Sequence, residues 1–385
     1  MGHRDRAKVR TTTMPLDERV IRATDLVACP DVFIDARNPG SSGKLNYALI
    51  GPGVSEESTQ YVHISEAHGF NLGAAAMPSG TVNSLHLHFT PEVFVNLRGD
   101  WLFRWGNDGT DGELLLHEGD VVSMPTWLFR GFSNVGGDDG MLLAVLGGDD
   151  TGGVIWAPSV LRAANANGLG LSSDNRVVDL RQVDSGTDLV EPLNDRHLAT
   201  LRSCTISEML QRTLRTHERT WLTEPWLCSS LPGGGVHACP VIGRGTIEHR
   251  YVAPLAVEAH GFSVAWVAGR PGTGVLQHRV SHQQAVVVRS GHWSIQIDVG
   301  DEQLSTTLGP WDTLSIPSGA ARSFVAVDDE PGELLLITEG DGRIGCDWAD
   351  DVTLRAGLAD RALDPNGCVV PLSALPPLAR RSGHT

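Results

Sequence analysis

Residues 80–99 read GTVNSLHLHFTPEVFVNLRG, and this stretch decides the fold. His86 and His88 are two residues apart, so in a β-strand both imidazoles project to the same face. Glu92 follows the Thr90-Pro91 pair, and proline suits a bend between strands because it cannot donate to a strand ladder. A carboxylate just past such a bend can return to the space that the two imidazoles share.

This stretch lies in one of two copies of a repeat. EAHGF occurs at 66–70 and again at 258–262, so the second copy begins 192 residues after the first. The same offset relates His86 to His278 and Arg130 to Arg322, with no insertion up to Gly148-Asp149 and its counterpart. Two copies of one domain are the direct interpretation.

Both copies consist of short apolar runs separated by Gly/Asp turns. VFVNL (93–97) and WLFRW (101–105) are examples in the first copy, and this spacing predicts an all-β sandwich or barrel. Helix is expected only in short segments, over 159–169 and over 199–218. The predicted parts are an N-terminal arm with the first barrel (1–190), a helical connector (191–245) and a second barrel (246–385).

Two motifs carry a resemblance to a known family. The pattern G-x5-H-x-H-x3-E-x6-G is matched at every fixed position, by Gly80, His86, His88, Glu92 and Gly99, and residues 119–134 match a second motif at Gly119, Pro125 and Asn134. These motifs resemble those of the cupin superfamily, and their duplication resembles a bicupin. The resemblance implies two tandem jelly-roll barrels with short connecting helices. It also implies that His86, His88 and Glu92 ligate a divalent metal, although hydrogen-bonded histidines in a metal-free barrel remain the alternative.

One position departs from the family pattern. Arg130 stands where cupins have a fourth ligand, a histidine, and Trp127 stands where the second motif has glycine. An arginine has no lone pair to give, so the protein ligands number three. The guanidinium can clamp an anionic group of a substrate, pair with Glu92, or turn outward. We assign Arg130 the first, catalytic role.

Strand parity predicts the wall of a substrate pocket. The side chains expected to face inward are Phe94, Trp101, Phe103, Trp105 and Phe132. Such a set suits the stacking of a planar substrate. The alternative is an ordinary aromatic core without a ligand.

The second copy has lost the metal motif. His278 remains, but Val280 and Gln284 replace the second histidine and the glutamate. One imidazole and one neutral amide do not hold a divalent ion tightly, so this barrel is predicted to be degenerate and non-catalytic. Structural pairing, dimerisation or secondary binding are the roles left to it, and we expect a homodimer.

Composition excludes several classes of partner. The 385 residues carry 30 basic and 46 acidic side chains, a net charge of -16, which disfavours binding to nucleic acid or to an anionic membrane. No apolar run approaches the ~20 residues of a membrane span. The N-terminal MGHRDRAKVR lacks the apolar stretch of a signal peptide, and six scattered cysteines without C-x-x-C are typical of reduced thiols. The expected location is therefore cytoplasmic.

The ligand set favours one function among three. Two histidines and one glutamate with open positions suit Fe(II), which predicts a dioxygenase-type oxygenase that uses dioxygen on a small, aromatic or anionic organic substrate. Zn, Mn or Ni in the same site would indicate a non-redox cyclase, isomerase or decarboxylase. A metal-free, ligand-binding bicupin is the third reading.

Overall fold

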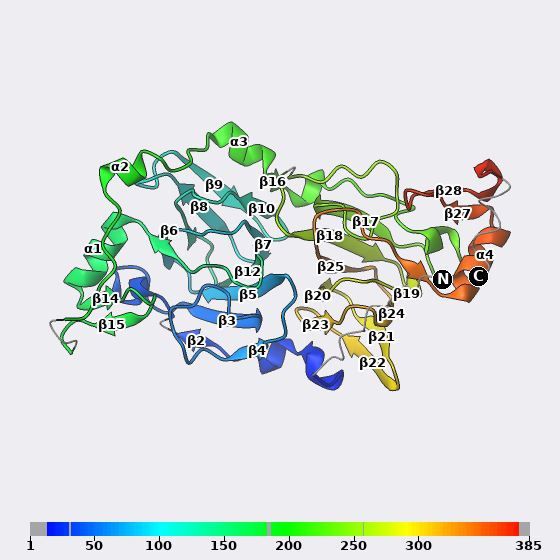
Figure 1. The fold of residues 1–385 in the computed structure, drawn as a ribbon, viewed down its shortest axis with the longest axis horizontal. Helices are drawn as coiled ribbons and strands as arrows, with labels where there is room; N and C mark the ends of the chain where they lie inside the picture. Colours follow the sequence, from blue (N-terminus) through cyan, green and yellow to red (C-terminus); the bar gives the residue numbers. More distant parts are fainter. Residues whose placement is uncertain (1–13, 31, 183–185, 257, 377–385) are drawn as a thin grey trace, which may run out of the picture.

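The computed structural model describes residues 14–30, 32–182, 186–256 and 258–376. Two β-barrels lie side by side, with a few short helices at their periphery (Figure 1). This confirms the predicted all-β pair of tandem jelly-roll barrels. No helix in the described part of the chain is long and apolar enough to span a membrane. The predicted absence of a signal peptide concerns residues 1–10, which lie outside the described residues.

The first barrel consists of two sheets. In order across the first sheet, its strands are β16 (Thr213–Leu214), β10 (Val121–Met124), β7 (Glu92–Arg98), β12 (Gly140–Gly147), β5 (Phe70–Met77), β3 (Leu45–Ile50) and β2 (Cys29–Pro30), with β4 (Val62–Ile64) paired to β3. The second sheet contains β13 (Ile155–Trp156), β6 (Val82–Leu87), β11 (Arg130–Asn134), β8 (Trp101–Trp105) and β9 (Gly112–Leu116). His86 and Glu92 therefore come from different sheets.

The second barrel repeats this arrangement. Its first sheet contains β1 (Val20–Ile21), β23 (Thr313–Ile316), β20 (Gln284–Ser290), β25 (Gly332–Glu339), β18 (Phe262–Gly269) and β17 (His237–Ile242). Its second sheet contains β22 (Glu302–Leu308), β21 (Trp293–Val299), β24 (Ala321–Ala326), β19 (Gly274–Arg279) and β26 (Asp347–Trp348). Because β17 belongs to this barrel, we place the start of the second barrel at β17, before the predicted residue 246.

A helix and a small hairpin follow each barrel. These are α1 (Pro158–Ala166) with β14 (Leu169–Leu171) and β15 (Val177–Asp179), and α4 (Asp350–Leu358) with β27 (Arg361–Leu363) and β28 (Val369–Pro371). Short 3-10 helices are η1 (Asp17–Arg19), η2 (Ala23–Asp25), η3 (Ile34–Arg37), η4 (Thr216–Glu218), η5 (Leu227–Ser230) and η6 (Leu372–Ala374). The repeat thus extends beyond the segment in which the sequence reveals it.

The connector differs from the single helix predicted over 199–218. The α-helices in this region are α2 (Asp195–Leu198) and α3 (Ile206–Gln211), and Thr216–Glu218 forms the short 3-10 helix η4. Thr205 begins α3 with a capping box to Glu208, and the helix ends before Thr213, where the chain pairs with β10. The prediction of one continuous helix is wrong. The apolar residues have helical spacing, but at Thr213–Leu214 the backbone hydrogen bonds are made to β10 and not within a helix.

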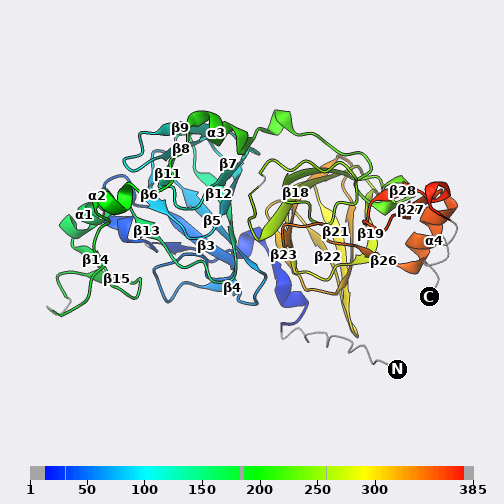
Figure 2. The same cartoon turned by 45° about the horizontal axis from the view of Figure 1, so that its top comes forward.

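The arms that precede the two repeats exchange partners, as Figure 2 shows for the N-terminal arm. β1 from the first arm pairs with β23 of the second barrel, with Val20 opposite Leu314. β16 from the connector pairs with β10 of the first barrel, with Leu214 opposite Val121. The first predicted part, residues 1–190, therefore contributes a strand to the opposite barrel.

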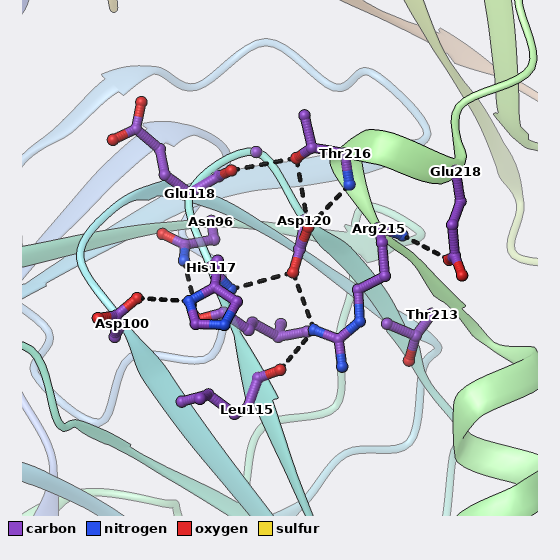
Figure 3. Close-up of polar contacts among 12 residues, drawn as sticks. Asn96, Asp100, Leu115, His117, Glu118, Asp120, Thr213, Arg215, Thr216 and Glu218 are labelled. Atoms are coloured by element: carbon purple, nitrogen blue, oxygen red, sulfur yellow. Dashed lines mark hydrogen bonds and ion pairs between the residues drawn. The ribbon is translucent and has the colours of Figure 1, made fainter.

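An aspartate in each barrel binds the incoming arm. Asp120 accepts hydrogen bonds from Nη1 of Arg215 (2.8 Å) and from the backbone N–H of Thr216 (2.8 Å), as Figure 3 shows. At the same place in the second barrel, Asp312 accepts from Nη1 of Arg22 (2.7 Å) and from the next backbone N–H. In each arm, one arginine side chain and one backbone N–H thus donate to the aspartate of the opposite barrel.

The repeated EAHGF motif also joins the barrels. Nε2 of His68 lies 2.7 Å from Oγ of Ser315, and Nε2 of His260 lies 2.8 Å from Oγ of Ser123. Each histidine contacts the serine of the opposite barrel. The glutamate of each motif binds an arm arginine: Glu66 binds Arg19, and Glu258 binds Arg212.

A buried apolar layer completes this interface. It combines residues of the first barrel with residues of the second: Val93, Val95, Leu143 and Val145 with Val264, Trp266, Leu335 and Ile337. Burial of apolar surface is the main favourable term in such a contact. One face of β7, the strand that begins with Glu92, is therefore packed against the second barrel.

Ser123→Ala and Ser315→Ala should each lower the free energy of unfolding by about 1–3 kcal/mol, because a buried histidine nitrogen loses its partner. Ser79→Ala is the control, since its hydroxyl bonds Gly136 at an exposed turn and its loss should change stability by less than about 0.5 kcal/mol. Chemical denaturation measures all three. A Ser123→Ala variant as stable as Ser79→Ala would contradict this role.

Candidate metal centre

Three predicted ligands converge inside the first barrel. His86 lies in β6, His88 follows the end of that strand, and Glu92 begins β7. Their possible ligand atoms all lie within 4.8 Å of one another, and all three side chains are buried. Within the described residues, this is the one such group of at least three His, Cys, Asp or Glu side chains.

Backbone carbonyls orient both imidazoles. Nδ1 of His86 donates to the carbonyl oxygen of Ser84 (2.7 Å), and Nδ1 of His88 donates to that of Gly153 (3.2 Å). The Nε2 lone pairs are therefore available, in the arrangement typical of metal-binding histidines. Burial, and next the positive charge of Arg130, hold the pKa of both histidines well below the usual value. Two neutral imidazoles and one carboxylate fit a divalent ion.

Arg130 binds Glu92. Its Nη2 donates to Oε2 of Glu92 at 2.6 Å, and both side chains are almost fully buried. Burial raises the pKa of Glu92, while the charge and hydrogen bond of Arg130 act in the opposite direction. Nε and Nη1 of Arg130 are buried and have no hydrogen-bond partner among the described residues. The pair with Glu92 is thus the alternative that the structure contains, and a contact between Arg130 and substrate stays a prediction.

The second barrel satisfies its arginine differently. Arg322 donates to the carbonyl oxygens of Val280, Pro317 and Ala320 and to Oε1 of Gln284. Its guanidinium therefore needs no further acceptor. Nδ1 of the remaining imidazole, His278, also bonds a backbone carbonyl.

A cavity opens beside the three candidate ligands of the first barrel. With its open mouth included, its volume is about 720 Å³. His86, His88 and Glu92 line it together with aromatic, aliphatic and amide side chains. Of the predicted wall, Phe94 and Phe132 line this cavity.

The other three predicted wall residues do not line the cavity. Trp101, Phe103 and Trp105 are completely buried, in an apolar cluster that they share with Phe94 and Phe132. Their parity is as expected, but they lie further along the barrel axis, where Phe103 packs against Phe94 and Phe132. For these positions the alternative, an ordinary aromatic core, describes the structure.

Comparisons with known proteins concern the fold. No family model matches the sequence, and no curated protein matches it either. Among solved structures, oxalate decarboxylase from Lactobacillus farciminis, in a formate complex, is similar with a TM-score of 0.55 and 12% identity, over 90% of this chain and 92% of the other. The chain folds as a bicupin. Oxalate decarboxylase from Bacillus subtilis at pH 4.6 has a TM-score of 0.51 and 13% identity, over 86% of this chain and 78% of the other.

A second layer of side chains, which the motifs did not predict, surrounds the three candidate ligands. The ring of Trp156 lies 5.5 Å from that of His86, and its Nε1 donates to Oε1 of Glu56 at 2.5 Å. Glu56 also accepts from the backbone N–H of Ile34. The second barrel has the same pair, in which Nε1 of Trp348 donates to Glu248. The 192-residue offset of both Trp and Glu was the available signal.

Glu56→Gln should change the pH dependence of stability. Burial, only partly offset by the hydrogen bonds of Trp156 and Ile34, raises the pKa of Glu56 from 4.5 to about 8. Because the pKa is higher in the folded protein than in the unfolded chain, the contribution of Glu56 to the free energy of unfolding is fully present below pH 4.5. That contribution is lost as the pH rises toward 8. The wild-type protein should therefore lose stability relative to Glu56→Gln between pH 5 and 7, by at most about 1.4 kcal/mol per pH unit.

Unfolding free energies of both proteins across this range measure the difference. Glu248→Gln provides a comparison in the second barrel, where burial raises the pKa of Glu248 to about 7. Parallel pH profiles for wild type and Glu56→Gln would show that Glu56 ionises as freely in the folded protein as in the unfolded chain.

Proposed function

We propose that this bicupin is a divalent-metal-dependent enzyme that acts on a small organic acid without redox chemistry, decarboxylation being the first reaction to test. The observation that carries the proposal is the buried His86, His88 and Glu92 group with Arg130 bound to its one carboxylate.

Charge supports an acidic substrate. Arg130 offsets the charge of Glu92, so a divalent ion held by the three ligands would leave two positive charges uncompensated. Uncompensated charge in a buried site is costly, and an anionic substrate removes this cost. The two nitrogens of Arg130 without a partner add unused donor capacity next to Glu92.

The residues have separate tasks in this proposal. His86, His88 and Glu92 would hold the ion, which supplies a Lewis acid that polarises a carboxylate or carbonyl oxygen of the substrate. The carbonyl oxygens of Ser84 and Gly153 keep the imidazoles in the ligating tautomer. Arg130 is a positioning residue, because it holds Oε2 of Glu92.

Two solved structures with similar folds are oxalate decarboxylases, one of them in a formate complex, which supports decarboxylation of a small acid as the first activity to test. An Fe(II) dioxygenase, the function favoured by the sequence, is the second candidate. Two histidines and one carboxylate without a fourth protein ligand are the donor set of non-haem Fe(II) oxygenases. Iron, manganese, zinc and nickel all remain compatible with this donor set.

Metal content tests the proposal first. Protein purified without added metal should hold one divalent ion per chain, and His88→Ala should lose at least nine-tenths of it. His278→Ala, which removes the remaining motif histidine of the second barrel, is the matched control and should keep it. Elemental analysis of folded samples makes the measurement. Wild-type protein that retains no ion after loading would contradict the proposal.

Turnover tests the reaction class. In a series of carboxylic acids that runs from oxalate to acids with an apolar body, the acid that reacts should release carbon dioxide equally with and without dioxygen. Turnover that consumes dioxygen in step with substrate would replace the lyase with the dioxygenase.

A further inference from the structure

We infer that the first barrel accepts an organic acid with a sizeable apolar body, larger than a two-carbon acid, and that Ala75 and Ala144 determine this specificity. The inference rests on the proposed function for the acidic group. The body of the substrate is inferred separately, from the wall of the cavity.

Small residues line the cavity on two neighbouring strands. Gly73 and Ala75 lie on β5, and Ala144 lies on β12 directly opposite Gly73. Ala75 is opposite Leu142, which also lines the cavity. Alternate residues of a strand share one face, so these side chains belong to the row that faces the barrel interior.

The second barrel is an internal comparison for this row. At the same register, β18 and β25 carry Ala265, Val267 and Leu336 in place of Gly73, Ala75 and Ala144. All three replacements are larger, and all belong to the hydrophobic core of the second barrel.

The pocket beside this row of residues is smaller in the second barrel than in the first. Ala265 and Leu336 border a pocket of about 240 Å³, against about 720 Å³ in the first barrel, with the open mouth included in both volumes. The barrel that kept the candidate ligands is therefore the one with room for a ligand. A two-carbon acid does not need this room, because it would be held at His86, His88 and Glu92 alone.

Other lining positions change in the opposite sense, such as Leu72 and Leu146, whose counterparts are Val264 and Thr338, and Phe94 is the one that bounds the room. Phe94 corresponds to the smaller Val286. The ring of Phe94 packs 5.1 Å from Phe103 and 5.2 Å from Phe132, so it closes the inner end of the cavity. The free space is left beside Ala75 and Ala144.

The rest of the lining indicates the chemistry of the body. Phe33, Trp156 and Val154 provide an apolar wall, which fits an aromatic or branched aliphatic group. Gln60 lines the same cavity, and its Oε1 is buried with no hydrogen-bond partner among the described residues. A substrate that also carries a hydroxyl donor would satisfy this oxygen.

Two hydroxy acids with the same head group test the inference. 3-Phenyllactate and glycolate both present a 2-hydroxy carboxylate, and they differ in the apolar body. Calorimetric titration of the full chain, with the metal it retains, should show at least tenfold tighter binding of 3-phenyllactate. Ala75→Val and Ala144→Leu, which introduce the residues of the second barrel, should weaken 3-phenyllactate at least tenfold and change glycolate less than twofold.

Ala76→Val is the matched control. Ala76 is the neighbour of Ala75 on β5 and does not line the cavity, so the same two added carbons should alter neither affinity. Melting temperatures establish that each variant folds. Weaker or equal binding of 3-phenyllactate by the wild type, or equal losses for both acids in the cavity variants, would overturn the inference.

Failure of the proposed function gives a different result. A chain without metal contradicts that function. The same pair of acids, titrated into the metal-free chain, still measures whether Ala75 and Ala144 select for the apolar body.

Discussion

Asp120 and Asp312 each bind the arm that precedes the opposite repeat, and this exchange holds the two barrels in one orientation. The His–Ser contacts and the apolar layer add to the same interface. The candidate site depends on this interface because β7 contributes to both: one face of the strand packs against the second barrel and the other faces the site. Val93 and Val95 pack toward the second barrel, while Glu92 and Phe94 face the interior. The carboxylate of the site is therefore positioned by a strand whose back is fixed by the other half of the molecule.

Two barrels with the same frame have diverged in their interiors. In the first, Arg130 has one acceptor, Glu92, and small residues leave an open cavity. In the second, Gln284 and three backbone carbonyls satisfy Arg322, and larger aliphatic side chains fill the space. The Trp–Glu pairs are common to both, so they belong to the frame. The two barrels thus differ both in charge pairing and in packing. The barrel whose interior is filled is also the one in which protein acceptors satisfy the arginine, so that no anion is needed there.

Local spacing predicted duplicated all-β domains and the convergence of His86, His88 and Glu92, because these depend on strand periodicity and one bend, whereas the bicupin fold came from the resemblance of the motifs. Trp101, Phe103 and Trp105 have the predicted parity but do not line the cavity, since parity specifies the face of a strand and not the depth along the barrel. The arms were missed because their shared pattern is only Arg-x-apolar-Arg, in RVIR (19–22) and RTLR (212–215). The role of Arg130 was left open between three alternatives, because only tertiary geometry says which acceptor the guanidinium reaches.

The reciprocal exchange of arms is the isologous contact of a twofold dimer, contained here in a single polypeptide. A single repeat holds both halves of that contact, the arm and the surface that receives it. Such a unit would pair with a copy of itself, and both of its sites would have to be identical. Duplication within one gene removes that constraint. Each half then mutates alone, so one barrel is free to fill its interior with larger side chains while its twin keeps the candidate ligands and the open cavity.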